Sequence, residues 1–159
     1  MSLLRIGVLT CSDTRTEEND TSGAALRTLA SERGWEVAAY AIVADDAGAI
    51  SAELVRMADE TACDVVLTTG GTGLSLRDQC PEATLAVADR PVPGIAEAIR
   101  LESLAITKRA MLSRAVAAQR GRTLIVNLPG SEKAARESFG IVAGQLEHAV
   151  EMMAGGGHS

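Results

Sequence analysis

The chain has 159 residues, a hydrophobic fraction of 47% and a net charge of −6. These values are typical of one globular domain with a buried core, and the acidic balance disfavours a nucleic-acid partner, which usually requires a basic face. No span approaches the roughly 20 apolar residues of a membrane helix, and the first residues do not resemble a secretory signal. We therefore expect a cytoplasmic protein with no membrane partner, and its three widely spaced cysteines favour reduced thiols.

Strand and helix patterns alternate through the first half of the chain. The expected strands cover 4–11, 35–43 and 64–69, and the expected helices cover 22–34 and 47–61. We expect Asp20 or Thr21 near the start of the first helix and Gly34 at its end. The apolar residues of the third strand run continuously, which is typical of a strand buried on both faces. The alternation predicts βαβ units on a parallel sheet.

The second half of the chain is less regular. A helix is expected to begin near Pro81, because proline is tolerated in a first helical turn. The pattern then predicts a turn at 91–94, a helix at 95–106, a strand at 122–130 and a long amphipathic helix at 132–153. The segment 110–118 is ambiguous between strand and irregular structure. We expect one domain over 1–153 and a flexible tail over 154–159.

A glycine-rich turn follows the third expected strand and is the main candidate site. Glycines allow close approach of the backbone to a ligand, and successive N–H groups in such a turn can cradle an anion. Arg77 would add a charge-assisted bond to a phosphate, and Asp78 could hold magnesium. The spacing matches neither a Walker loop nor the dinucleotide fingerprint. A tight connection without a ligand is the competing interpretation of the turn, which comprises Gly70, Gly71, Thr72 and Gly73.

Carboxylates follow three strands of the same expected sheet. Asp13 comes after the first strand, beside Ser12, Asp45 comes after the second, and Asp78 comes after the third. Singly, each is also explained as a solvated loop residue or a helix cap. Together they would repel one another unless a cation lies among them. Mg²⁺ bound to a nucleotide phosphate would be such a cation and would relieve the repulsion.

Four further residues are weaker candidates for binding. Ser113 and Arg114 could bind phosphate, although a surface arginine at a strand end is an equally good interpretation. Asn127 is a polar side chain near the end of a late strand and needs a hydrogen-bond partner. Ser131 belongs to the Pro-Gly-Ser turn that follows the same strand.

The motifs, taken in order, resemble the molybdopterin-binding family of molybdenum-cofactor biosynthesis. The resemblance extends from about residue 4 to about residue 149. It is carried by "SDTR" at 12–15, "DTSG" at 20–23, "VADD" at 43–46, "TTGGTG" at 68–73, "RDQCPEAT" at 77–84, "PG" at 93–94, "LSR" at 112–114 and "NLPGS" at 127–131.

The resemblance implies a fold and an activity. The implied fold is a Rossmann-like, three-layer α/β/α sandwich with a mostly parallel sheet, assembled into a trimer or hexamer. The implied activity is transfer of AMP from Mg-ATP to the terminal phosphate of molybdopterin, with Asp45 and Asp78 as catalytic and Mg²⁺-binding residues. The expected substrate-binding residues are Ser12, Asp13, Gly70, Gly71, Thr72, Gly73, Arg77, Gly94, Ser113, Arg114, Asn127, Gly130 and Ser131.

Two positions depart from the family pattern. Cys80 stands where a threonine is usual between the two halves of "RDQCPEAT", and a thiol is a weaker hydrogen-bond donor than a hydroxyl. Ala118 replaces a glycine that is common after "LSR". Two alternatives to the enzyme stay open: a non-catalytic pterin-binding paralogue and an oligomeric scaffold.

Overall fold

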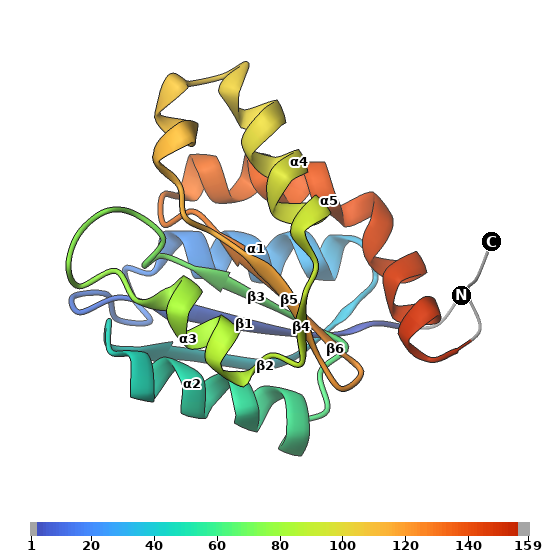
Figure 1. Ribbon diagram of the computed structural model, residues 1–159. Helices are drawn as coiled ribbons and strands as arrows, with labels where there is room; N and C mark the ends of the chain where they lie inside the picture. The colour runs from blue at the N-terminus through green and yellow to red at the C-terminus, as the bar shows by residue number, and fades with distance from the viewer. Residues whose placement is uncertain (1–2, 156–159) are drawn as a thin grey trace.

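Six strands form one sheet in the computed structural model, which describes residues 3–155 (Figure 1). The strands are β1 (Arg5–Cys11), β2 (Glu36–Val43), β3 (Val65–Thr69), β4 (Arg90–Pro91), β5 (Ala117–Arg120) and β6 (Thr123–Leu128). Their order across the sheet is β2-β1-β3-β6-β5-β4. β1, β2, β3 and β6 run parallel, and β5 and β4 add an antiparallel edge. The predicted mostly parallel sheet is confirmed.

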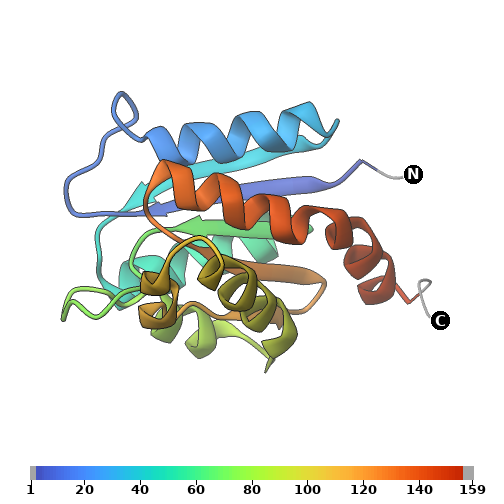
Figure 2. The ribbon, with the colours of Figure 1, turned by 90° about the horizontal axis from the view of Figure 1, so that it is seen from above.

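Helices cover both faces of this sheet. They are α1 (Thr21–Glu32), α2 (Ala47–Val55), the π-helical turn η1 (Arg56–Glu60), α3 (Cys80–Val87), α4 (Pro93–Leu104), the 3₁₀ turn η2 (Lys108–Leu112) and α5 (Glu132–Met153). α1, α4 and α5 lie on one face, and α2 and α3 lie on the other (Figures 1 and 2). The predicted three-layer α/β/α architecture is therefore confirmed. Among residues 3–155, no helix is long and apolar enough to span a bilayer.

Two apolar clusters fill the space between the layers. Alternate strand residues such as Val8 and Leu67 join the cluster against α1 and α5, whereas Leu9 and Val66 join the cluster against α2 and α3. Because strand side chains alternate in direction, a sheet covered on both faces favours apolar residues on both sides of its central strands. Every residue of β3 is buried, as its continuous apolar run predicts.

The ends of α1 show how local chemistry fixes the elements around the sheet. Asp20 is the N-cap, and its carboxylate accepts a hydrogen bond from the Gly23 amide at 3.0 Å. The same carboxylate accepts hydrogen bonds from the hydroxyls of Thr10 and Tyr40, both at 2.6 Å. The cap therefore ties α1 to β1 and β2. Gly34, with a φ of 81°, follows the helix as predicted.

Several predicted boundaries differ from the structure. The segment predicted as a turn at 91–94 contains the end of β4 and the first turn of α4, which begins at Pro93 rather than at residue 95. The second predicted helix continues only to Val55 as an α-helix and then widens into η1. The ambiguous segment 110–118 contains the end of η2 and the start of β5. Ala154 and Gly155 close α5 through backbone hydrogen bonds, and the rest of the predicted tail lies outside the described residues.

Candidate functional site

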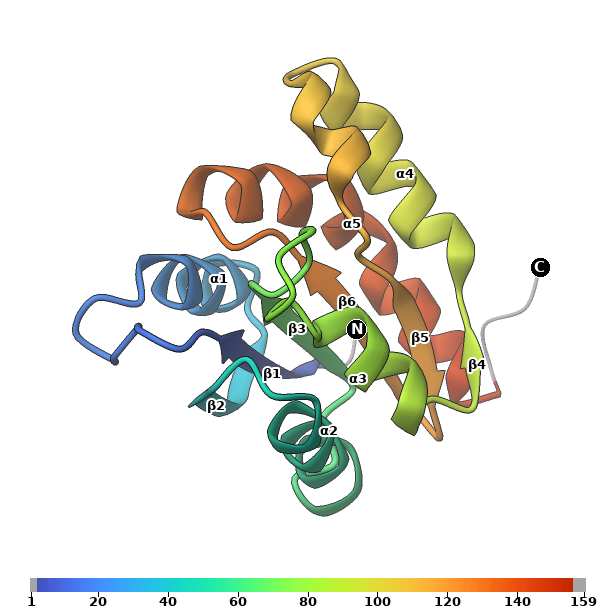
Figure 3. The ribbon, with the colours of Figure 1, turned by 60° about the vertical axis from the view of Figure 1, so that its left-hand side comes forward.

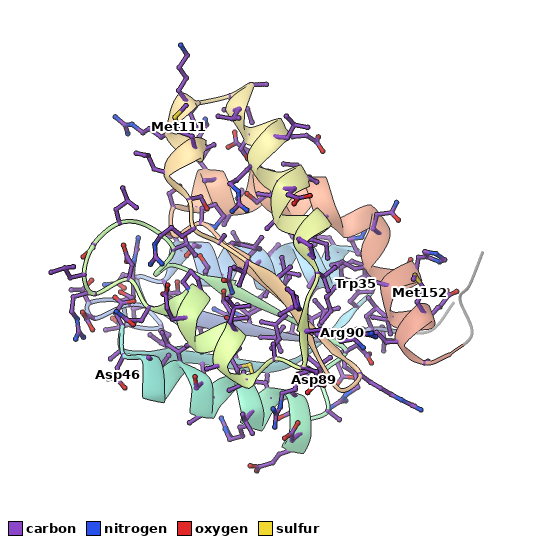
Figure 4. All side chains as sticks on the ribbon, in the orientation of Figure 1. Trp35, Asp46, Asp89, Arg90, Met111 and Met152 are labelled. Atoms are coloured by element: carbon purple, nitrogen blue, oxygen red, sulfur yellow. The ribbon has the colours of Figure 1, made fainter. Side chains whose placement is uncertain are left out.

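The loops after the four parallel strands meet at one edge of the sheet. In Figure 3 this edge comes forward, with the blue segment after β1 and the green segment after β3. Figure 4 marks Asp46 at the same edge, at the start of α2, where its carboxylate caps the helix by accepting from the Ala49 amide at 2.9 Å. Ligands of open α/β sheets bind beyond the carboxyl ends of the strands. This edge is therefore the candidate site.

The glycine turn after β3 requires its glycines. Gly70 has a φ of 95°, and a Cβ atom placed on it would overlap the carbonyl oxygen of Cys11. Gly70 also donates its amide to the carbonyl of Leu128 at 3.2 Å. A Cβ atom on Gly130 would lie 3.3 Å from the Cα of Gly70. The ends of β1, β3 and β6 thus pack backbone against backbone, which leaves no room for side chains between the loops.

Asp45 and Asp78 lie against this turn. A Cβ atom on Gly71 would lie 3.3 Å from Asp45 Oδ1, and a Cβ atom on Gly73 would lie 3.0 Å from Asp78 Oδ2. Asp78 Oδ2 accepts a hydrogen bond from the Ser75 amide at 3.0 Å. Asp45 Oδ1 is buried and has no hydrogen-bond partner among the residues that the structure describes. The two carboxylates that the sequence singles out are therefore neighbours of one turn.

The electrostatics of Asp45 are unfavourable for its ionised form. Burial, reinforced by the negative charges of Asp13 and Asp78, raises the pKa of Asp45 above its ordinary value of 3.8. An unpaired, partly desolvated carboxylate beside two others is stabilised by a cation. Within residues 3–155, no group of three or more His, Cys, Asp or Glu side chains is arranged to hold a metal ion. Carboxylate oxygens are a ligand type that Mg²⁺ accepts when phosphate oxygens and water complete its coordination.

Arg77 forms an ion pair with Asp13 across the loops after β1 and β3. Its Nη2 lies 2.8 Å from Asp13 Oδ1 and its Nε lies 3.0 Å from Asp13 Oδ2. Asp13 Oδ1 also accepts a hydrogen bond from the Asp45 amide at 3.0 Å, and the bond from Arg77 holds the pKa of Asp13 below its usual value. The predicted phosphate contact would have to share or replace this ion pair. Ser12 Oγ accepts hydrogen bonds from the amides of Thr14 and Arg15 and shapes the same loop.

Arg114 holds the loop between β3 and α3. Its Nε donates to the Gly73 carbonyl at 2.7 Å, and its Nη2 donates to the Asp78 carbonyl at 2.9 Å. The remaining arm of the guanidinium pairs with Glu82, and the Arg114 amide donates to the Thr72 carbonyl at 2.9 Å. Arg114, which the sequence suggested as a phosphate-binding residue, thus positions the loop that carries Asp78.

A cavity of about 620 Å³ adjoins the glycine turn. It lies between α4, η2 and the first turns of α5, and Thr72 and Pro129 border it at the side of the turn. Ser131, the N-cap of α5, accepts a hydrogen bond from the Ala134 amide at 3.2 Å, so the positive end of the helix dipole faces this region. Of the residues expected to bind substrate, Thr72, Ser113 and Ser131 line the cavity.

Asn127 and Gly94 lie apart from these groups. Asn127 is buried, its Nδ2 donates to the hydroxyls of Thr68 and Thr84, and its Oδ1 accepts from the Val116 amide. The side chain thus joins β6 to β3, α3 and the segment before β5. These bonds supply the hydrogen-bond partners that its buried position requires, and they engage both its amide nitrogen and its amide oxygen. Gly94 lies in the first turn of α4, whose opposite end lines the cavity, and a Cβ atom on it would meet nothing within 4 Å.

The two departures from the family pattern are both buried. The Sγ of Cys80 lies 3.2 Å from the hydroxyl of Thr68, and so it occupies a hydrogen-bonding position inside the core. Ala118 is fully buried in β5. Neither residue lies on the cavity wall.

Sequence reasoning missed most of the cavity wall. The missed residues are Ile99, Arg100, Ser103, Ile106, Thr107, Arg109, Ala110, Leu112, Pro129, Lys133, Ala134, Glu137 and Ser138. One signal was available in the sequence. Ser138 is a hydroxyl on the apolar stripe of α5, between Ala135 and Val142, at the spacing of a buried helix face.

The chain is similar to known proteins over most of its length. Residues 7–148 match the family model described as a probable molybdopterin binding domain. The chain is 40% identical to a molybdopterin adenylyltransferase of Helicobacter pylori, over 98% of this chain and 90% of that protein. It is 45% identical to molybdenum cofactor biosynthesis protein B of Escherichia coli, over 90% of this chain and 85% of that protein. The solved structure of the molybdopterin biosynthesis enzyme MoaB from Thermus thermophilus superposes with a TM-score of 0.89 at 48% identity, over 96% of this chain and 98% of that one.

Proposed function

The chain belongs to the molybdopterin-binding family of molybdenum-cofactor biosynthesis, and on that premise we propose that it transfers AMP from Mg-ATP to the terminal phosphate of molybdopterin. The observation that carries the proposal is the orphaned Oδ1 of Asp45, which is buried beside the glycine turn and repelled by two neighbouring carboxylates. A relative with 40% identity over nearly the whole chain is named molybdopterin adenylyltransferase, which supports the proposal.

Asp45 and Asp78 would hold the Mg²⁺ ion of the nucleotide. The ion, when bound, neutralises charge on the phosphates during transfer. Asp45 offers an oxygen without a protein partner, and the carboxylate of Asp78 is anchored by the Ser75 amide at 3.0 Å. Arg114 holds the backbone at Asp78 and therefore positions this carboxylate relative to the glycine turn.

The two substrates would occupy adjacent spaces. The phosphates of ATP lie at the glycine turn, where backbone amides and Arg77 stabilise negative charge. The pterin enters the cavity, whose volume of about 620 Å³ is ordinary for a small-molecule site. An oxygen of the terminal molybdopterin phosphate attacks the α-phosphorus of ATP, the bond from that phosphorus to the bridging oxygen breaks, and pyrophosphate leaves. Catalysis rests on positioning and charge stabilisation.

The decisive experiment replaces Asp78 with Ala. We expect the Asp78→Ala variant to lose AMP transfer, measured as adenylylated pterin from molybdopterin and Mg-ATP, and to keep its affinity for molybdopterin. Asp89→Asn is the control, because Asp89 lies between α3 and β4, away from the candidate edge (Figure 4). Unchanged turnover in Asp78→Ala would remove the assigned role.

A pterin-binding protein without transfer activity is the second candidate. It is favoured by the similarity to the E. coli protein, molybdenum cofactor biosynthesis protein B, whose name states a pathway but no reaction. The same assay decides between the two, because this candidate binds molybdopterin and forms no adenylylated product.

The assembly and setting are also proposals. We infer one domain acting as a homo-oligomer, because α4, η2 and the connection between them expose large apolar side chains, namely Leu101, Leu104, Ile106, Met111 and Leu112. The three cysteines are free thiols, which suits the reducing cytoplasm.

A further inference from the structure

Two consecutive residues of α5, Glu137 and Ser138, line the cavity wall. Ser138 is 1% exposed, and its hydroxyl has no hydrogen-bond partner among the described residues. A buried polar group without a partner is rare in native proteins, because it loses its hydrogen bonds to water on burial. A helical serine often relieves this cost by bonding the carbonyl four residues earlier, and Ser138 does not.

The Glu137 carboxylate is only weakly engaged. Its ion-pair partner is Lys133, at 3.4 Å, and the Lys133 side chain is 80% exposed. Exposed pairs of this kind contribute little to stability, since water competes for both charges. The Glu137 side chain itself is 31% exposed, so its oxygens are more sheltered than those of a fully solvated glutamate. A ligand in the cavity can therefore use this carboxylate without breaking a strong protein contact.

The two side chains offer complementary hydrogen-bonding chemistry. An ionised carboxylate only accepts hydrogen bonds, whereas a serine hydroxyl both donates and accepts. Ile99, Ile106 and Leu112 add apolar side chains to the wall, which also contains the cationic side chains of Arg100, Arg109 and Lys133. This combination fits a flat heterocycle whose edge carries N–H donors next to a carbonyl oxygen.

We propose that Glu137 and Ser138 recognise the 2-amino-4-oxo edge of the pterin ring, with Glu137 accepting from the amino group and ring N–H and Ser138 donating to the 4-oxo group. This inference rests on the proposed function, because that function places a pterin in the cavity. Glu137 then selects for the 2-amino group, since a 2-oxo group would bring an oxygen against the carboxylate.

The test compares two fragments that differ only at this edge. The probes are 6-hydroxymethylpterin and 6-hydroxymethyl-lumazine, which carries an oxo group in place of the 2-amino group, and the readout is affinity from ligand fluorescence. We expect the parent protein to prefer the pterin by about tenfold or more, as loss of a hydrogen bond to a charged group implies. Glu137→Gln should weaken pterin binding by about tenfold and bring the preference close to one. Ser138→Ala should weaken both probes by several-fold, because both carry the 4-oxo group.

Glu132→Gln is the matched control on the same helix. Glu132 pairs with Arg136 at 3.0 Å and does not line the cavity, so both affinities should stay at the parent values. A parent protein with no preference between the probes, or a Glu137→Gln variant that keeps the preference, would overturn the inference. If adenylylated pterin is still formed, that failure leaves the proposed function intact. Conversely, a Glu137-dependent preference without AMP transfer would support the recognition and remove the activity.

Discussion

At the scale of single residues, the position of Asp45 destabilises the fold and leaves a carboxylate oxygen available to a ligand. Its carboxylate is half-buried, lacks a partner for Oδ1 within the described residues, and lies near the charges of Asp13 and Asp78. Such an arrangement lowers the stability of the fold when all three groups are ionised. Strained electrostatics of this kind are common at functional sites, where a ligand charge relieves them.

Replacing Asp45 with Asn separates these two effects. The raised pKa means that folding disfavours the ionised form of Asp45. The resulting loss of folding free energy is complete above the folded-state pKa and vanishes as the pH falls below 3.8. We therefore expect Asp45→Asn to have a higher free energy of unfolding than the parent at pH 7, and this difference should shrink in acid. AMP transfer should fall by roughly a hundredfold or more. Denaturant unfolding at several pH values, together with the transfer assay, measures both, and a variant less stable than the parent at pH 7 contradicts the electrostatic account.

Gly70 is the second residue with a sharp expectation. Its φ of 95° and its contact with the Cys11 carbonyl both exclude a side chain, so Gly70→Ala should lower the free energy of unfolding by about 2 kcal/mol or more. Gly140→Ala is the control, because Gly140 lies on α5 with nothing within 4 Å of an added Cβ atom. That substitution should instead raise stability by about 0.5–1 kcal/mol, since alanine favours helix. Equal effects of the two substitutions would show that the turn tolerates a side chain.

At the scale of elements, the loop between β3 and α3 depends on a residue far along the chain. Arg114 donates to carbonyls of this loop through two nitrogens, and it also pairs with Glu82 in α3. Lysine has one ammonium group and no planar fork, so it cannot reproduce these bonds together. The loop geometry that positions Asp78 is therefore set by the guanidinium.

We expect Arg114→Lys to loosen this loop. Amide hydrogen exchange should become faster for residues 74–79, and the turnover number for AMP transfer should fall by about tenfold or more, because small displacements of catalytic groups are costly. Arg136→Lys is the control, as Arg136 makes only an exposed pair with Glu132 on α5 among the side-chain contacts described. Loss of activity with unchanged exchange in the loop would argue that Arg114 contacts substrate instead.

Predictability also differs between elements and their contacts. The continuous apolar pattern of β3 and the amphipathic pattern of α5 predicted these two elements correctly, because the pattern of apolar residues follows directly from burial. Pro93 was expected in a turn and instead begins α4, since proline suits both a turn and a first helical turn. For Arg114 and Asn127, residue type indicated polarity but not partners, because their partners come from segments distant in sequence. The cavity was missed for the same reason, as its wall combines α4, η2 and α5.

At the scale of the whole molecule, the exposed apolar residues of α4 and η2 require an explanation. Leu101 is 72% exposed and Met111 is 64% exposed, and neither lines the cavity. Both belong to the part of the chain that projects above the sheet in Figure 1. Large apolar side chains exposed on two neighbouring elements commonly mark an interface, and a second copy of the chain is the partner that we propose.

Light scattering tests this assignment directly. We expect the parent to have a mass that is a multiple of the 16.5 kDa chain. The double variant Leu101→Gln with Met111→Gln should need a roughly hundredfold higher protein concentration to stay assembled, because burying each side chain contributes about 1.5 kcal/mol. Met152→Gln is the control, since Met152 is 56% exposed but lies on α5 at the opposite side of the molecule from Met111 (Figure 4). A monomeric parent, or a double variant that assembles like the parent, would place the interface elsewhere and leave the apolar surface of α4 and η2 for a different partner.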